Sequence, residues 1–231
     1  MEVELVESVL KSNDRIAREI RERLEREGVF AVNLISSPGA GKTTLLEATL
    51  PSLQRQGVRC AVIEGDLFTT LDGERIGRTG TPVVQLNTRG GCHLDASMVA
   101  AALEKLDLKA VDILWIENVG NLVCPAQYDL GEQLTVVLLS VVEGNDKPLK
   151  YPPAFLRAGA CVVTKTDLLP YSGLDLERLK QDVERIHPGM PFIPVSARTG
   201  EGMEAWLAFL ERERSRWQGR GGPAAARMTA G

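Results

Sequence analysis

The sequence has few of the features that mark a membrane or secreted protein. No apolar run approaches the ~20 residues that a helix needs to span a bilayer. The N-terminal stretch MEVELVESVLKSNDRIAREI carries acidic residues where a signal peptide carries basic ones, so we expect no export signal. The widely spaced cysteines do not resemble the framework of a small disulfide-rich protein. These absences predict a cytoplasmic protein with free thiols and no membrane association.

An excess of basic residues is also missing. The chain has 27 Lys and Arg against 31 Asp and Glu, a net charge of −4, which weighs against binding to nucleic acid. Its 44% hydrophobic and 25% charged residues are typical of an ordinary globular protein. A length of 231 residues suits one α/β domain, or one with a small appendage, and suffices for a sizeable core.

Apolar runs and amphipathic segments alternate along the chain. Residues 3–27 predict one amphipathic helix, with its apolar stripe at Val6, Leu10, Ile16, Ile20 and Leu24. Apolar runs predict strands at 29–36, 58–66, 82–87, 111–118, 133–144, 159–167 and 191–196. Helices are predicted directly after the glycine-rich loop at 38–41 and at 94–106, 174–187 and 202–217. This order predicts an α/β fold with a mostly parallel sheet and helices on both faces. We expect an N-terminal helix (1–28), a central domain (29–213) and a disordered tail (214–231).

A phosphate-binding loop is the most specific short motif. SSPGAGKTT lies between a predicted strand and a predicted helix, where backbone N–H groups and the helix dipole bind phosphates. We expect Lys42 to reach the β- and γ-phosphates and the Thr43 hydroxyl to hold Mg²⁺. Ser36 replaces the usual first glycine, and a glycine-rich turn that binds no nucleotide is the alternative. The expected phosphate contacts are Gly39, Ala40, Gly41, Lys42, Thr43 and Thr44.

Two later segments indicate which base is bound. TKTD, at the end of a predicted strand, resembles the N/T-K-x-D element of GTPases, with Thr164 in place of the common Asn. The Asp167 carboxylate can accept hydrogen bonds from N1–H and from the exocyclic amine of guanine, whereas adenine offers no such donor pair. Lys165 is expected to lie over the base. Ser196 and Ala197, in PVSARTGEG, resemble the loop that contacts the guanine carbonyl, so GTP is favoured over ATP.

Acidic residues for Mg²⁺ and for hydrolysis follow the predicted strands. Glu117 and Gly120 stand in the place of the D-x-x-G element that senses the γ-phosphate, and Asp66 and Asp72 lie in the predicted switch region. Phosphoryl transfer needs positioning and charge neutralisation more than a nucleophilic side chain. We therefore expect catalytic roles for Lys42, Asp72 and Glu117, although a solvated-loop role for one of the two aspartates stays open. The candidate Mg²⁺ ligands are Thr43, Asp66, Asp72 and Glu117.

A Cys-His pair indicates a second kind of site. Cys92 and His93 follow paired glycines, and Cys124 lies on the segment that begins at Glu117. All three are expected at the carboxyl edge of the sheet, where open α/β folds bind ligands. Two thiols and an imidazole suit Zn²⁺ or Ni²⁺, and two chains paired about a two-fold axis would complete or double the set. The alternative is a buried apolar role for each thiol and a surface role for the imidazole.

We expect structural roles for the other two cysteines and for the second histidine. Cys60 and Cys161 lie within apolar strands, so core packing is expected of both. His187 closes a predicted helix, where an imidazolium complements the helix dipole, and no metal role is expected of it.

Taken together, five segments resemble the HypB family, the hydrogenase nickel-incorporation GTPases: LISSPGAGKTTLLE, GCHLDA, ENVGNLVCPAQYDLGE, VEGNDKPLKYP and TKTDL. The resemblance runs from about residue 5 to residue 212. It implies a P-loop fold of the SIMIBI class, a slow GTPase that converts GTP and water to GDP and phosphate with Mg²⁺, and a GTP-dependent homodimer. It also implies a nickel or zinc site at the dimer contact, made by Cys92, His93 and Cys124.

The resemblance further implies a pathway. Members deliver nickel to the large subunit of NiFe hydrogenase together with a small zinc- and nickel-binding accessory protein. Many carry a histidine-rich tract or a short N-terminal cysteine motif; this chain has neither, so bulk nickel storage is not expected. The lysines of DKPLKYP are expected on an exposed segment, with contact to a partner as one reading and solvation as the other. The N-terminal helix either packs on the domain, the favoured reading, or docks the accessory protein.

The predicted mechanism is a switch. Ordering of the Asp72 and Glu117 loops by GTP would favour the dimer and alter metal geometry through Cys124, and hydrolysis would loosen the site. Three rivals stay open. A urease metallochaperone would carry a Cys-Pro-His signature, which is absent; a GTPase chaperone of cobalamin-dependent mutases would not need the Cys-His pair; and a GTP-gated scaffold would use zinc structurally.

Overall fold

The computed structural model describes residues 2–66, 70–88 and 90–220, and the side chains of 9–66 within the first of these ranges. A seven-stranded sheet has the order β3-β2-β4-β1-β5-β6-β7. Each pair of neighbouring strands is parallel, which confirms the predicted sheet. The strands are β1 (Phe30–Ser36), β2 (Cys60–Asp66), β3 (Val83–Asn87), β4 (Ile113–Glu117), β5 (Leu134–Ser140), β6 (Ala160–Thr164) and β7 (Phe192–Pro194).

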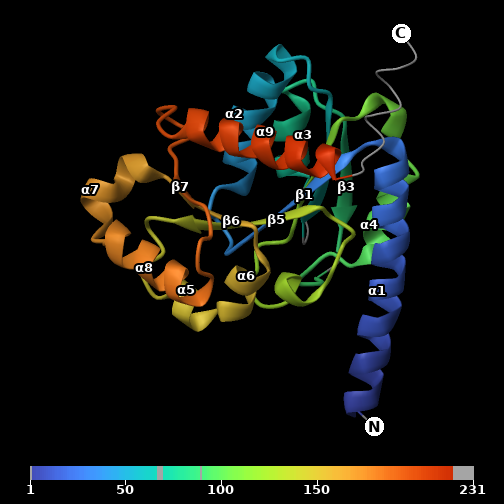
Figure 1. Cartoon of the computed structure of the whole chain (residues 1–231), viewed down its shortest axis with the longest axis horizontal. Coiled ribbons are helices and arrows are strands. Elements are labelled where there is room, and N and C mark those ends of the chain that lie inside the picture. Colours follow the sequence, from blue (N-terminus) through green and yellow to red (C-terminus); the bar gives the residue numbers. More distant parts are fainter. Residues whose placement is uncertain (1, 67–69, 89, 221–231) are drawn as a thin grey trace.

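Helices cover both faces of this sheet (Figure 1). The longer ones are α1 (Glu2–Glu27), α2 (Lys42–Arg55), α3 (Leu71–Gly77), α4 (Ala96–Leu103), α8 (Leu176–Ile186) and α9 (Met203–Gly219). Short helices complete the connections: α5 (Lys147–Lys150), α6 (Pro152–Arg157), α7 (Leu169–Ser172), η1 (Leu108–Ala110), η2 (Pro125–Gln127) and η3 (Thr166–Leu168). None of the helices in the described ranges combines the length and apolar character that crossing a membrane requires.

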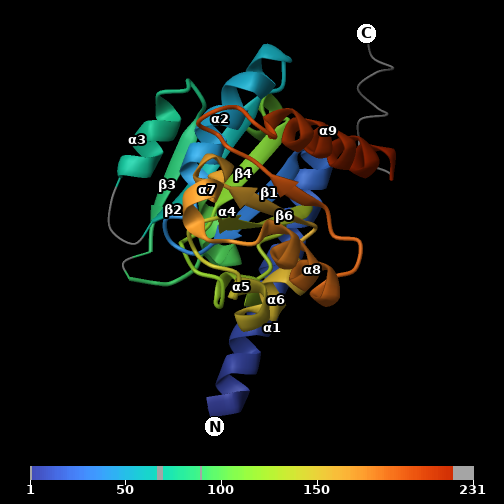
Figure 2. The ribbon, with the colours of Figure 1, turned by 90° about the vertical axis from the view of Figure 1, so that its left-hand side faces the viewer.

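Three buried clusters separate the helices by face. On one face α2, α3 and α9 pack against the sheet around Trp115 and Trp206. On the other face α1 and α4 cover one half of the sheet, and α6 and α8 cover the other half. Figure 2, turned by 90° from Figure 1, shows the same layers from the side and the first turns of α1 extending beyond the domain. Strands buried on both faces explain the near-continuous apolar runs of the sequence.

The strand register brings the carboxyl ends of the central strands to one edge. Glu117 of β4 pairs with Leu34 of β1 and with Glu64 of β2. On the other side of β1, Ser140 of β5 pairs with Thr164 of β6. The chain reverses its direction of winding at β1, which lies between β4 and β5, and ligands of open α/β sheets bind in the crevice at such a point.

Several element boundaries differ from the sequence-based expectation. The predicted helix 94–106 begins at Ala96, because the Asp95 side chain caps α4 by accepting from Met98 N–H, and it ends at Leu103. The predicted strand 133–144 ends at Ser140, where a turn joins Glu143 N–H to the Ser140 carbonyl. DKPLKYP forms parts of α5 and α6. Residues 214–219 of the predicted tail are helical, and 221–231 lie outside the described residues; the division at residues 28 and 213 stays a prediction.

Candidate functional site

The loop between β1 and α2 has the backbone expected of a phosphate cradle. Gly39 and Gly41 have φ values of +73° and +96°, which L side chains rarely adopt. Lys42 opens α2 and is buried, and its Nζ donates to the Ser36 hydroxyl at 3.1 Å. Burial lowers the pKa of Lys42 against the raising effect of Glu117. Ser36, which replaces the usual first glycine, therefore holds the lysine in this structure.

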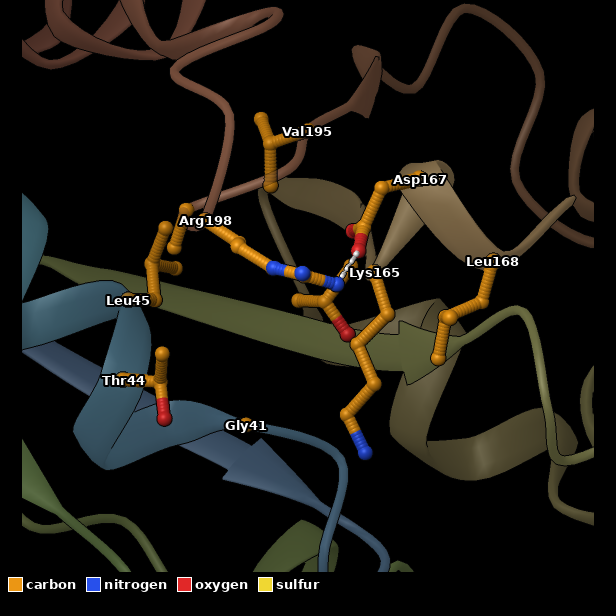
Figure 3. A pocket seen from close by; sticks show the side chains of 10 residues that line it. Gly41, Thr44, Leu45, Lys165, Asp167, Leu168, Val195 and Arg198 are labelled. Carbon is orange, nitrogen blue, oxygen red and sulfur yellow. Dashed lines mark ion pairs between the residues drawn. The ribbon is translucent and has the colours of Figure 1, made fainter.

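A cavity of about 230 Å³ adjoins this loop on the β6 side (Figure 3). Asp167, Lys165 and Ala197 line it, together with Gly41 and Thr44 of the phosphate loop. Asp167 Oδ1 accepts a 2.7 Å hydrogen bond from the Ser196 hydroxyl, which fixes the carboxylate. The predicted base-recognition residues thus line or adjoin one cavity.

Two hydrogen bonds join the TKTD segment, which lines the base cavity, to the phosphate-binding loop. Lys165, the non-glycine residue with a positive φ (59°) among the described residues, donates from Nζ to the Gly39 carbonyl at 2.6 Å. The Thr164 hydroxyl donates to the Ala40 carbonyl at 2.5 Å. Threonine in place of the common asparagine therefore keeps a polar link to the phosphate loop.

A second cavity, of about 200 Å³, is lined by Gly39 and Lys42 of the phosphate loop. Asp66, Asp72 and Glu117 line it, and Glu64 joins them. The Thr43 hydroxyl donates to Glu117 Oε1 at 2.6 Å, while Glu117 Oε2 is buried without a hydrogen-bond partner. Burial raises the pKa of Glu117 to about 7, opposed by the charge of Lys42. An unpartnered buried carboxylate oxygen beside a threonine hydroxyl matches the oxygen ligands that Mg²⁺ prefers, so these residues fit that ion.

Glu64 is the acid that sequence reasoning missed. Carboxylate oxygens of Glu64, Asp66 and Asp72 lie within 4.8 Å of one another, and Glu64 Oε2 has no hydrogen-bond partner. Burial, followed by the neighbouring Glu117 charge, raises the pKa of Glu64 to about 8. Its signal in the sequence is an acid directly after the apolar residues CAVI, inside a predicted strand, where packing alone gives no reason for a carboxylate.

The Cys92, His93 and Cys124 side chains meet at the same edge of the sheet. One ligand atom from each lies within 4.8 Å of the others. The two Sγ atoms are 3.0 Å apart, and Cys92 Sγ is 3.6 Å from His93 Nδ1. The hydrogen bond with Cys92 raises the pKa of the Cys124 thiol, and burial lowers the pKa of His93. Two sulfurs and one imidazole in this arrangement offer three ligands to a thiophilic divalent ion.

Neighbouring residues hold these two loops together. Asn121 donates from its side-chain amide to the Cys92 carbonyl at 3.3 Å, and its backbone forms an isolated antiparallel bridge with Ser36. The His93 ring stacks on Tyr128, with ring centroids 3.9 Å apart and an interplanar angle of 28°. The thiol-bearing loops are thus linked to each other and to the start of the phosphate loop.

Three residues of metal-binding type lie away from this site, as predicted. Cys60 and Cys161 are buried in β2 and β6, and burial raises the pKa of both thiols. His187 follows α8 and its Nδ1 lies 3.0 Å from the Phe155 carbonyl. Core packing of the two cysteines is thereby confirmed.

Comparisons with known proteins agree with this arrangement. Residues 30–194 match the nucleotide-binding domain of the CobW/HypB/UreG family. The hydrogenase maturation factor HypB of Azotobacter chroococcum mcd 1 is 52% identical over 212 residues, which cover 92% of this chain and 69% of that protein. The chain belongs to the HypB family. HypB of Escherichia coli K12 is 50% identical over 214 residues, covering 93% and 73% of the two chains.

A solved member of the HypB family has the same fold. The crystal structure of HypB from Helicobacter pylori in complex with nickel superposes with a TM-score of 0.84 at 39% identity, and the match covers 89% of this chain and 96% of that one. The predicted family, the SIMIBI-class P-loop fold and the GTPase class of the chain are thereby confirmed. The roles of individual site residues stay predictions.

Proposed function

We propose that the chain is a GTP-driven metallochaperone of the cytoplasm that delivers nickel to the large subunit of NiFe hydrogenase. It would receive or exchange nickel with a small nickel- and zinc-binding accessory protein and act as a homodimer. One observation carries this proposal: the three thiol and imidazole ligands meet at the edge of the sheet that also bears the phosphate loop, and Cys124 lies on the segment that begins at Glu117.

The nucleotide would bind across the two cavities that adjoin the phosphate loop. Asp167 and Lys165 bind guanine, with Ser196 orienting the Asp167 carboxylate and Ala197 lining the base cavity. The backbone of Gly39, Ala40 and Gly41, with Thr44, follows the phosphates. Lys42 neutralises charge on the β- and γ-phosphates.

Hydrolysis would depend on positioning around the second cavity. Thr43, Glu117, Asp66 and Asp72 are the proposed Mg²⁺ ligands, directly or through water. Mg²⁺, when bound, supplies neutralisation of the phosphate charge. Arg75 donates to Asp72 Oδ1 at 2.8 Å and to Glu47 Oε2 at 2.6 Å, so it holds the Asp72 carboxylate at the cavity wall. A slow, switch-type turnover is proposed from the family resemblance.

Nickel is the proposed cargo, bound by Cys92, His93 and Cys124. The H. pylori relative is a nickel complex, and the donor set found here suits the same ion, with zinc as the competitor. Three ligands from one chain leave a position that a second copy can fill, which supports the homodimer. Nucleotide state would change the metal geometry because Glu117 and Cys124 share one segment.

An anaerobic titration tests this function. Ni²⁺ is added to metal-free protein with GDP or with a non-hydrolysable GTP analogue, and light scattering reports dimerisation. We expect nucleotide-dependent affinity or stoichiometry that is lost in Cys92→Ser and in Cys124→Ser. Cys60→Ala is the matched control, because Cys60 lies in the core and away from the site. Nickel binding that is indifferent to nucleotide and to both site cysteines would overturn the proposal.

A further inference from the structure

The residue after the Cys-His pair is hydrogen-bonded to the segment that begins at Glu117. Leu94 N–H donates to Asn118 Oδ1 at 3.1 Å, and the same oxygen accepts from Val119 N–H at 3.0 Å. Asn118 immediately follows Glu117 and is buried. Its own N–H donates to the Leu34 carbonyl on β1. Asn118 therefore joins the loop that carries His93 to the segment that begins with Glu117.

The Leu94 side chain also packs against the end of β2, which lines the second cavity. Leu94 is fully buried, and it lies so close to Gly65 that a Cβ on that glycine would come within 2.8 Å of Leu94 Cγ. Gly65 stands between Glu64 and Asp66 on β2. Leu94 thus packs directly on the strand end that carries two of the acids of the second cavity.

The other end of the same loop is held by a different asparagine. Asn13 of α1 accepts from Ala96 N–H at 2.8 Å and donates to the Asp129 carbonyl at 2.8 Å. Asn13 is also buried. It links the Cys-His loop to the loop after Cys124, but these two contacts do not reach the phosphate side. Two buried asparagines and the more exposed Asn121 therefore hold the loop, and Asn118 is the one that binds it at the residue next to Glu117.

On this basis we propose that Asn118 is the positioning residue that couples nucleotide state to the Cys92–His93 loop; the inference rests on the proposed function. When the segment starting at Glu117 changes position with the bound nucleotide, Asn118 carries Leu94 N–H with it. His93 is the adjoining residue and moves with Leu94, so the loop that carries Cys92 and His93 follows the bound nucleotide as the Cys124 segment does. Packed elements with discrete arrangements transmit such changes well, because close-packed interiors do not deform continuously.

The coupling is measured as the ratio of the nickel affinities in the two nucleotide states. Nickel affinity is determined by anaerobic titration with GDP and with a non-hydrolysable GTP analogue, for the wild type, Asn118→Ala and Asn13→Ala. Couplings between sites are typically about 5–150-fold, and we expect the wild type to lie in this range. In Asn118→Ala the ratio should fall without reaching one, because Cys124 still lies on the segment that begins at Glu117 while the Cys92–His93 loop no longer follows it. In Asn13→Ala the nickel affinity should fall equally in both nucleotide states, leaving the ratio unchanged.

Further variants guard against a purely structural effect. Asn118→Asp keeps an oxygen that accepts from Leu94 N–H and should retain the ratio. Asn118→Ser, whose hydroxyl is too short to reach Leu94, serves in place of the alanine variant if thermal unfolding shows that variant to be unfolded. Reciprocity requires that nickel change nucleotide affinity by the same factor, so the nucleotide affinities with and without nickel must show the same loss.

The outcomes separate the two proposals. A wild type whose nickel affinity does not depend on nucleotide contradicts the proposed function, whatever the variants do. A wild type with a clear ratio that Asn118→Ala or Asn118→Ser retains in full overturns the role of Asn118 and leaves the proposed function standing. Loss of the ratio in Asn13→Ala as well would also overturn it, because general loosening of the loop would then suffice.

Discussion

The hydroxyl of Thr43 donates a 2.6 Å hydrogen bond to the carboxylate of Glu117, and both side chains are buried. This contact joins the first turn of α2 to the end of β4, and the backbone bridge between Ser36 and Asn121 links the phosphate loop to the same segment, which leads to Cys124. The second Glu117 oxygen has no hydrogen-bond partner. An unpaired buried oxygen costs free energy, which a cation bound there would offset.

Glu117→Gln removes the charge but keeps an oxygen that can accept from Thr43. We expect the fold to persist and GTP hydrolysis to fall by roughly 10²–10³, the range typical of losing one electrostatic contact to a transition state. Single-turnover hydrolysis over a Mg²⁺ titration measures the effect, and the variant should require more Mg²⁺. Glu104→Gln is the control, since Glu104 lies in an exposed ion pair with Arg23. A Glu117→Gln rate equal to that of Glu104→Gln would remove Glu117 from the proposed machinery.

The residues of the base cavity lead to a prediction about nucleotide specificity. In Asp167→Asn one acceptor oxygen becomes an amide donor, so guanine loses a hydrogen bond and faces an opposing N–H. Each lost buried hydrogen bond costs about 1–3 kcal/mol, so GTP affinity should fall roughly 10–100-fold. Xanthine carries a carbonyl where guanine carries the amine, and XTP should gain affinity. Competition titrations with GTP, XTP and ATP measure this change; unchanged discrimination would place the base elsewhere.

Much of this arrangement could be predicted from local patterns. A glycine loop between a buried strand and a helix requires a particular backbone, and Gly39 and Gly41 have it. Parallel strands end at one edge, so motifs that follow strands were expected to gather there. For this reason Cys92, His93 and Cys124 were expected to meet although they come from two loops.

What could not be predicted depends on contacts between distant segments. Glu64 and Asn118 point into the site from positions that periodicity assigns to a strand and its end, and the partner atoms of Asn118 are set by tertiary packing. The boundaries of α4 and of β5 depend on single capping and turn hydrogen bonds. The last helix extends to Gly219, and the Trp217 ring near its end packs against the Phe30 ring of β1. This contact joins residues far apart in the sequence, so no local pattern predicts it.

A ring contact beside the metal ligands yields the next prediction. Tyr128 stacks on His93 and so restricts the orientation of the imidazole. Aromatic pairs contribute about 0.5–1.5 kcal/mol, so Tyr128→Leu should weaken nickel binding roughly 2–10-fold and alter the ligand-field spectrum. Tyr128→Phe keeps the stacked ring and is the matched control. Tyr128→Leu that binds nickel with wild-type affinity and an unchanged spectrum would show that the stacking does not orient the ligand.

The last prediction concerns stability and pH at the opposite edge of the sheet. Asp112, just before β4, accepts from the Arg59 backbone N–H at 2.9 Å and from its Nε and Nη2 at 3.0 and 2.9 Å. These hydrogen bonds hold the pKa of Asp112 below its ordinary value of 3.8. The folded protein therefore binds fewer protons here than the unfolded chain, and the contribution to stability is complete above the unfolded pKa.

Asp112→Asn should accordingly lower the free energy of unfolding at pH 7, by on the order of 1 kcal/mol because Arg59 is half exposed and solvent screens the pair. The difference between wild type and variant should shrink as the pH falls below 4 and through the folded pKa, since the wild-type carboxylate is then protonated. Urea unfolding at pH 7, 5, 3.5 and 2.5 measures it. Asp146→Asn, which breaks an exposed pair with Lys150, should show no difference at any of these pH values. A constant Asp112→Asn difference from pH 7 to 2.5 would mean that packing, and not charge, accounts for the contribution of Asp112.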